Sequence, residues 1–187
     1  GAMLQIDLLT TYVTCGAASC AAALMTALAR AGEPELARAL RTSSVGFAVL
    51  GLSLLQLVQG VDGPMAASML LALAGSTVGI GGIGWGLAQL AGCRVRGRAV
   101  TVGVGLALAA QAAALPWGAM AVGVAYSAGI TLMCAATTWA LRDFVRRPRD
   151  VTEGLIGWMM VAFVLAYAAR TGLALAHGWP ASWRSGR

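Results

Sequence analysis

Long runs of apolar residues alternate with short polar connectors along almost the whole chain. Six runs approach the length of about 20 mostly apolar residues that a helix needs to cross a bilayer. They cover residues 8–28, 43–59, 65–91, 99–115, 117–141 and 155–177. The runs are too long for barrel strands and lack strand-type alternation, so helices must satisfy the backbone within the membrane. The pattern therefore predicts an all-α integral membrane protein, a bundle of six helices.

The composition excludes an ordinary water-soluble domain. Of the 187 residues, 59% are apolar and only 11% are charged, against about 25% charged residues in a typical soluble domain. Gly1 and Ala2 look like the remnant of a cleaved tag before a native Met3. We expect residues 3–179 to form the membrane-embedded domain and residues 180–187 to form a C-terminal tail.

Most basic residues lie in alternate connectors. Ten of the thirteen lie in three of the five: Arg30, Arg38 and Arg41; Arg94, Arg96 and Arg98; and Arg142, Arg146, Arg147 and Arg149. The positive-inside rule makes these connectors cytoplasmic. Both termini are then predicted on the outer side of the membrane. The net charge of +6 comes from these loops, so we expect no nucleic-acid partner.

The third run is rich in glycine. Residues 79–84 match the letters of the dinucleotide fingerprint G-x-G-x-x-G, but no strand precedes them and no acidic residue follows at the required distance. Gly75 and Gly79 form one G-x-x-x-G pair, and Gly82 and Gly86 form another. This spacing is typical of helices that approach each other closely, because no Cβ atom stands between them. We therefore assign these four glycines to helix packing.

Polar residues at membrane depth are the candidates for a ligand site, because burying them is costly. Arg170 leads them. Its two interpretations are a structural role, by pairing with Asp7 or Asp62 or by snorkelling, and contact with an anionic or polar ligand. The residues that could join it are Tyr12, Gln56, Gln59, Gln111, Tyr126 and Tyr167. Gln56 and Gln59 share a helix face, as do Tyr167 and Arg170, so the two pairs would meet if the second and sixth spans were neighbours.

No motif for catalysis or metal binding is present in the sequence. His177 is the only histidine, and the four cysteines lack the spacing of metal ligands. Neither a nucleophile elbow, nor a metalloprotease helix, nor a phosphate-binding loop occurs. We expect no enzymatic activity, no metal and no cofactor in this chain.

Several segments together resemble a known family. They are the start at residues 3–10, which leads straight into the first run, and residues 45–51, which open the second. The glycine-rich residues 79–86 followed by the basic residues 94–98, the segment 139–147, and Ala168-Ala169-Arg170 complete the set. This pattern resembles the N-terminal multi-span membrane sensor regions of GGDEF (diguanylate cyclase) signalling proteins. The resemblance implies a bacterial inner membrane with both termini on its periplasmic side, a further span after residue 187, and a cytoplasmic output such as cyclic-di-GMP synthesis.

Two main hypotheses for function follow. The first is a membrane-embedded sensory or regulatory module, which responds to a small hydrophobic or amphipathic ligand or to the membrane itself. Its expected partners are the lipid bilayer, that ligand and a second copy of the chain in a homodimer. The alternative is a small transporter or channel that works as an oligomer, since glycine-rich helices and a membrane-embedded arginine suit that class. A membrane enzyme ranks third, because acid–base chemistry needs positioned titratable groups.

Overall fold

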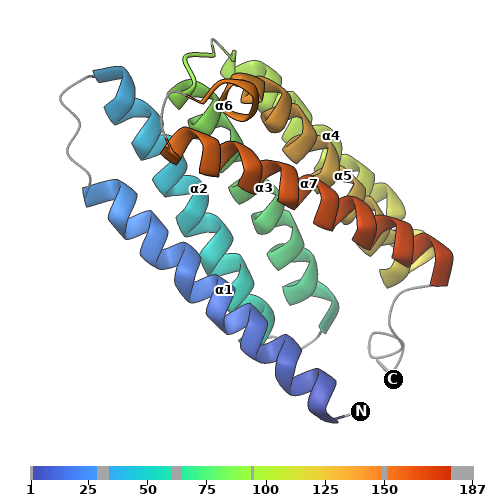
Figure 1. Cartoon of the computed structure of the whole chain (residues 1–187). Coiled ribbons are helices and arrows are strands. Elements are labelled where there is room, and N and C mark those ends of the chain that lie inside the picture. Colours follow the sequence, from blue (N-terminus) through green and yellow to red (C-terminus); the bar gives the residue numbers. More distant parts are fainter. Residues whose placement is uncertain (1, 29–33, 60–64, 94, 149–150, 178–187) are drawn as a thin grey trace. The chain divides into compact units, whose positions relative to one another are not determined.

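The chain is helical wherever its structure is described. A computed structural model describes residues 2–28, 34–59, 65–93, 95–148 and 151–177, and within these ranges only helices and short turns occur (Figure 1). The all-α prediction is therefore confirmed for the described residues. Contacts divide the chain into two units, residues 1–86 and 87–187, and each unit is described by itself below.

The first unit contains α1 (Ala2–Leu28), α2 (Pro34–Gln59) and most of α3 (Met65–Leu90). Helices α1 and α2 lie side by side over much of their length (Figure 1). The Ser44 hydroxyl of α2 donates a hydrogen bond to the Ala23 carbonyl of α1 at 2.8 Å. A side-chain hydrogen bond between two helices favours one register between them.

The glycines of α3 lie directly against α2. A methyl group added at Gly79 would stand 2.7 Å from the Leu50 amide nitrogen and 2.9 Å from the Gly46 carbonyl oxygen. One added at Gly82 would stand 3.1 Å from the Gly46 Cα atom, and Gly75 and Gly86 face serines of the same helix. The four glycines assigned to packing therefore form the surface on which α2 rests.

The second unit is built around α5 (Ala119–Ala140). Helices α4 (Gly97–Ala114) and α7 (Val151–His177) both pack against α5, and the short α6 (Arg142–Arg146) packs on α7. Helices α4 and α5 are joined by the 3₁₀ helix η2 (Leu115–Trp117), which ends at Gly118. Gly118 has φ +86°, a conformation that favours glycine.

The end of α3 is fixed to the end of α5 within this unit. Gly92 has φ +73°, its amide donates to the Gln89 carbonyl at 3.0 Å, and the Cys93 amide donates to the Ala88 carbonyl at 2.9 Å. This pair of bonds is a Schellman motif, which ends a helix by using a left-handed residue. The Cys93 thiol then donates to the Ala140 carbonyl at 3.3 Å.

Among the described residues, five helices are long and apolar enough to cross a membrane. Their apolar segments are Pro34–Gln56, Ala67–Leu90, Gly97–Trp117, Met120–Ala140 and Glu153–Leu173. Five of the six predicted spans are thus confirmed in length and composition, and the architecture is that of a multi-pass membrane protein. In the first span, the apolar segment Val13–Leu28 is shorter, so its crossing stays a prediction. The orientation of the termini and the kind of membrane also stay predictions.

Two connectors differ from their prediction. Helix α2 begins at Pro34 and not at residue 43, so Arg38 and Arg41 lie on the helix and not in a connector. The reason is that Pro34 suits a first helical position, and the acidic Glu35 favours a helix start before the apolar run begins. Arg142 and Arg146 likewise lie on a helix, α6, inside the predicted fifth connector. Arg30 lies outside the described residues.

Candidate functional site

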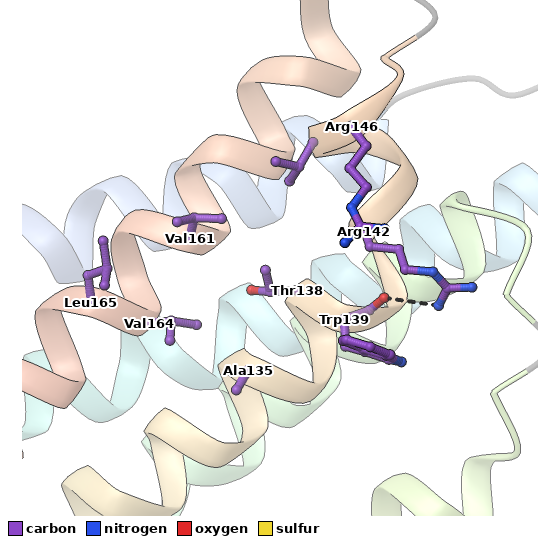
Figure 2. A pocket seen from close by; sticks show the side chains of 9 residues that line it. Ala135, Thr138, Trp139, Arg142, Arg146, Val161, Val164 and Leu165 are labelled. Atoms are coloured by element: carbon purple, nitrogen blue, oxygen red, sulfur yellow. Dashed lines mark hydrogen bonds between the residues drawn. The ribbon is translucent and has the colours of Figure 1, made fainter.

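A cleft of about 290 Å³ opens between α5, α6 and α7 of the second unit (Figure 2). All three helices contribute side chains to it. The residues that line it are Ala135, Thr138 and Trp139 of α5, Arg142, Val145 and Arg146 of α6, and Val161, Val164 and Leu165 of α7. The whole site therefore belongs to one unit, and its geometry follows from contacts within that unit.

The walls of the cleft are apolar. On α5 the wall is formed by the small side chains of Ala135 and Thr138, which leave space opposite the branched side chains of α7 (Figure 2). The Thr138 hydroxyl donates to the Cys134 carbonyl of its own helix at 2.8 Å. This bond satisfies the hydroxyl without a ligand. What the walls offer to a ligand is therefore mainly van der Waals contact and exclusion of water.

Two arginines stand at the α6 end of the cleft. The Arg142 guanidinium lies 5.6 Å from the centre of the Trp139 ring, and its Nη1 donates to the Trp139 carbonyl at 3.4 Å (Figure 2). The contact over the ring is a cation–π interaction, which keeps the arginine at the edge of the cleft. Arg146 follows Arg142 by four residues, so both lie on one face of α6. Both arginines are exposed.

A glycine of α7 brings α6 close. A methyl group added at Gly157 would stand 3.1 Å from the Phe144 carbonyl carbon and from the Val145 amide nitrogen. Backbone therefore meets backbone at this point, and a larger residue would displace α6. Because α6 carries both arginines, the close contact at Gly157 determines how near the arginines lie to the apolar walls on α7.

The cleft runs from the end of the apolar spans toward membrane depth. Helix α6 lies between the spans Met120–Ala140 and Glu153–Leu173. Helix α6 contacts α7 at Gly157, and Val161 lies four residues further along α7, about 6 Å along the axis at the usual rise per residue. Arg142 and Arg146 therefore lie near the boundary of the apolar spans, and Val161 and Val164 lie deeper within the span Glu153–Leu173.

The polar residues predicted as ligand contacts lie elsewhere. Gln111 of α4 and Tyr126 of α5 are both buried. Gly129 of α5 stands against Ala107 of α4, and this antiparallel register brings Gln111 level with residue 125, next to Tyr126. Tyr167 and Arg170 are half-buried on one face of α7. All four residues take part in interactions within the chain.

The remaining predicted contacts belong to the first unit. Gln56 is half-buried on α2, whereas the side chains of Tyr12, Gln59 and Asp7, and all of Asp62, lie outside what the structure describes. A meeting of the two glutamines with Tyr167 and Arg170 therefore stays a prediction, as does an acidic partner for Arg170. The described members of this set do not line the α5–α6–α7 cleft.

Sequence reasoning missed the cleft because it explained each of its features separately. The sequence pattern explains Arg142 and Arg146 as topology signals alone, and it assigns Trp139 no role in a site. The available signal was the combination: two arginines four residues apart, directly after a tryptophan, beside a helix end.

No family model matches the chain, and neither a curated protein nor a solved structure matches it. Function must therefore be inferred from the geometry of the chain itself. Among the described residues, no three histidine, cysteine or acidic side chains come close enough together to hold a metal ion.

Proposed function

We propose that the chain is a membrane-embedded sensory or regulatory module that binds an amphipathic ligand in the α5–α6–α7 cleft. The observation that carries this proposal is the combination of apolar walls with two arginines at one end. An amphipathic molecule has the same division: an apolar chain that gains from burial and a polar end that gains from hydrogen bonds.

A ligand in this cleft would change how three helices sit together. Its walls come from α5 and α7, which pack directly on each other. Helix α6, which carries the two arginines, contacts α7 at Gly157. A ligand can shift a conformational equilibrium only if it binds one arrangement better than the other. A chain wedged between α5 and α7 meets this requirement, because it favours arrangements in which the two helices stand further apart.

The predicted orientation determines on which side of the membrane the module would act. If the arginine-bearing connectors are cytoplasmic, α6 moves at the cytoplasmic surface, where an output domain would detect it. The resemblance noted in the sequence makes a diguanylate cyclase the proposed output, and a bacterial inner membrane the proposed location. A GGDEF-encoding segment downstream in the native reading frame would support this part of the proposal.

The binding step is tested with a photoactivatable fatty acid that carries a diazirine in its chain. The purified chain is placed in nanodiscs, irradiated and digested, and the labelled peptides are identified by mass spectrometry. We expect saturable labelling of the α5 and α7 peptides that line the cleft. Ala135→Trp fills the cleft and should abolish this labelling, because tryptophan occupies the space that the ligand needs.

Leu173→Trp is the matched control, because Leu173 is exposed on α7 and does not line the cleft. It should leave the saturable labelling unchanged. Equal labelling in the wild type and the Ala135→Trp variant would contradict the proposal. Substrate flux through liposomes that contain only this chain would instead favour the transporter hypothesis.

A further inference from the structure

We infer that the occupant of the α5–α6–α7 cleft is an anionic phospholipid, bound with one acyl chain between α5 and α7 and its phosphate between Arg142 and Arg146. This inference rests on the proposed function and names the class of its ligand. Four features carry it: the charge of the cleft's end, the spacing of the arginines, the openness of the cleft and its depth.

The charge of the α6 end favours an anion. Arg142 and Arg146 lie on one face of α6, and Asp143 is the only acidic residue of that helix. Arg146 is exposed, and among the described residues its side chain makes no ion pair and no hydrogen bond. Guanidinium groups match the geometry of phosphate and bind it through paired hydrogen bonds.

The spacing of the two arginines suits one phosphate group. Residues four apart on a helix have Cβ atoms about 5–6 Å apart, so two long side chains can converge on a group of phosphate size. The Trp139 ring and carbonyl already hold Arg142 at the edge of the cleft. Less conformational freedom is then lost when an anion binds.

The cleft is open along one side. This openness suits a bilayer lipid, which enters from the side, better than a soluble ligand, most of whose surface is usually buried in its pocket. Trp139 is 71% exposed and Leu165 is 64% exposed, although both line the cleft. A lipid can therefore insert one chain while its second chain remains in the bilayer. The volume of about 290 Å³ is at the small end of the range for ligand pockets, which agrees with one chain segment.

The depth of the cleft matches a lipid that stands in its own leaflet. Arg142 and Arg146 lie near the boundary of the apolar spans, and Val161 and Val164 lie deeper in the span Glu153–Leu173, so a headgroup and its acyl chain would meet matching surfaces without leaving the bilayer. The positive-inside rule makes this the cytoplasmic leaflet, whose anionic lipids attract basic side chains.

The test compares phosphatidylglycerol with phosphatidylcholine by native mass spectrometry of the purified chain in detergent. Both lipids are titrated together and the ratio of the bound species is measured. For the wild type we expect a preference for phosphatidylglycerol. Arg142→Gln combined with Arg146→Gln should reduce this preference on the order of tenfold, since each arginine at a membrane surface contributes to anionic lipid binding.

Arg96→Gln combined with Arg98→Gln is the matched control. It removes the same charge from another predicted cytoplasmic connector, and neither residue lines the cleft. The inference requires that this variant keeps the wild-type preference. An equal loss in both double variants would show general attraction of lipids to basic loops, and no loss in either would show that the arginines do not select the headgroup; each result overturns the inference. If the Arg142/Arg146 variant does not fold, Arg146→Gln alone serves in its place.

The Ala135→Trp variant separates this inference from the proposed function. If the wild type binds both lipids equally and Ala135→Trp excludes both, the cleft is an amphiphile site without headgroup selection. The inference then fails while the proposed function stands. If Ala135→Trp excludes neither lipid, the cleft is not the binding site and both proposals fail.

Discussion

At the scale of single residues, glycine decides how closely the helices of the first unit approach. The nearest atoms to an added methyl group at Gly79 are backbone atoms of Gly46 and Leu50. A backbone cannot rotate away as the end of a side chain can, so a larger residue must push the helices apart. The same residue type at Gly105 of α4 meets open space, because nothing lies within 4 Å of an added methyl group.

We predict opposite effects of leucine at these two positions. Gly79→Leu should destabilise the chain by about 1–3 kcal/mol, as extra bulk does in a well-packed interior. Gly105→Leu should be neutral or stabilising by up to about 1 kcal/mol, because it removes the cost of glycine in a helix without a clash. Thermal unfolding in detergent, followed by circular dichroism, measures both. Similar unfolding temperatures for the two variants would show that Gly79 is not at a close helix contact.

A hydroxyl group provides a second residue-scale prediction. Ser44 donates across the α1–α2 contact to Ala23, whereas Thr101 donates to Gly97 of its own helix. Ser44→Ala should lower the free energy of unfolding in SDS by about 0.6 kcal/mol, the average for hydrogen bonds between membrane helices. Thr101→Ala should have a smaller effect, because the helix keeps its backbone bonds. A larger loss from Thr101→Ala would contradict the assignment of Ser44 to helix pairing.

At the scale of elements, the position of α6 is set by α7 through Gly157. We predict that Gly157→Leu weakens the preference for phosphatidylglycerol in the native mass spectrometry experiment, although Gly157 does not line the cleft. The physical reason is that leucine would displace the Phe144–Val145 backbone and move Arg142 and Arg146 away from the cleft.

Gly172→Leu is the control for this prediction, because it is in the same helix and nothing lies within 4 Å of an added methyl group there. It should retain the wild-type lipid preference. Retention of that preference by Gly157→Leu would mean that α6 is not held through this contact. Loss of it in both variants would point to a general effect of leucine on α7.

The helices could be predicted from the sequence more fully than the site. Apolar run length located five spans, since hydrocarbon thickness sets the length of a membrane helix. The pattern placed the start of α2 too late, because apolarity reports the membrane boundary, whereas Pro34 and Glu35 start the helix in the polar region before it. Hydrogen bonding and packing, and not hydropathy, decide where a helix begins.

The cleft could not be predicted, because it depends on the register between helices. Ala135 and Thr138 become a wall only when α7 places Val161 and Val164 opposite them. Nothing in the apolar pattern of either helix fixes that register, and the close approach of α6 at Gly157 adds a further constraint. Arg170 is predicted as a ligand contact only because it lies at membrane depth. An arginine at that depth can equally be satisfied by groups of its own chain, and Arg170 does take part in such an interaction.

At the scale of the whole molecule, function depends on which side of the membrane α6 occupies. The three basic connectors predict that α6 is cytoplasmic and that the connector around residue 62 is outside. Labelling of single cysteines in intact cells tests this directly. The four native cysteines are first replaced by alanine, and Arg96→Cys and Asp62→Cys are then introduced in separate chains. A maleimide that cannot cross the membrane is the reagent.

We predict that the cysteine at position 62 is labelled in intact cells and that the cysteine at position 96 is labelled only after the membrane is permeabilised. Arg146→Cys should behave like position 96, because it lies in the third basic connector. Labelling of position 96 from outside, or the same result at positions 62 and 96, would contradict the topology. In that case the arginines of the cleft would face the outer leaflet, and the anionic lipid would have to come from that side. The cleft itself would be unchanged, because its geometry depends only on α5, α6 and α7.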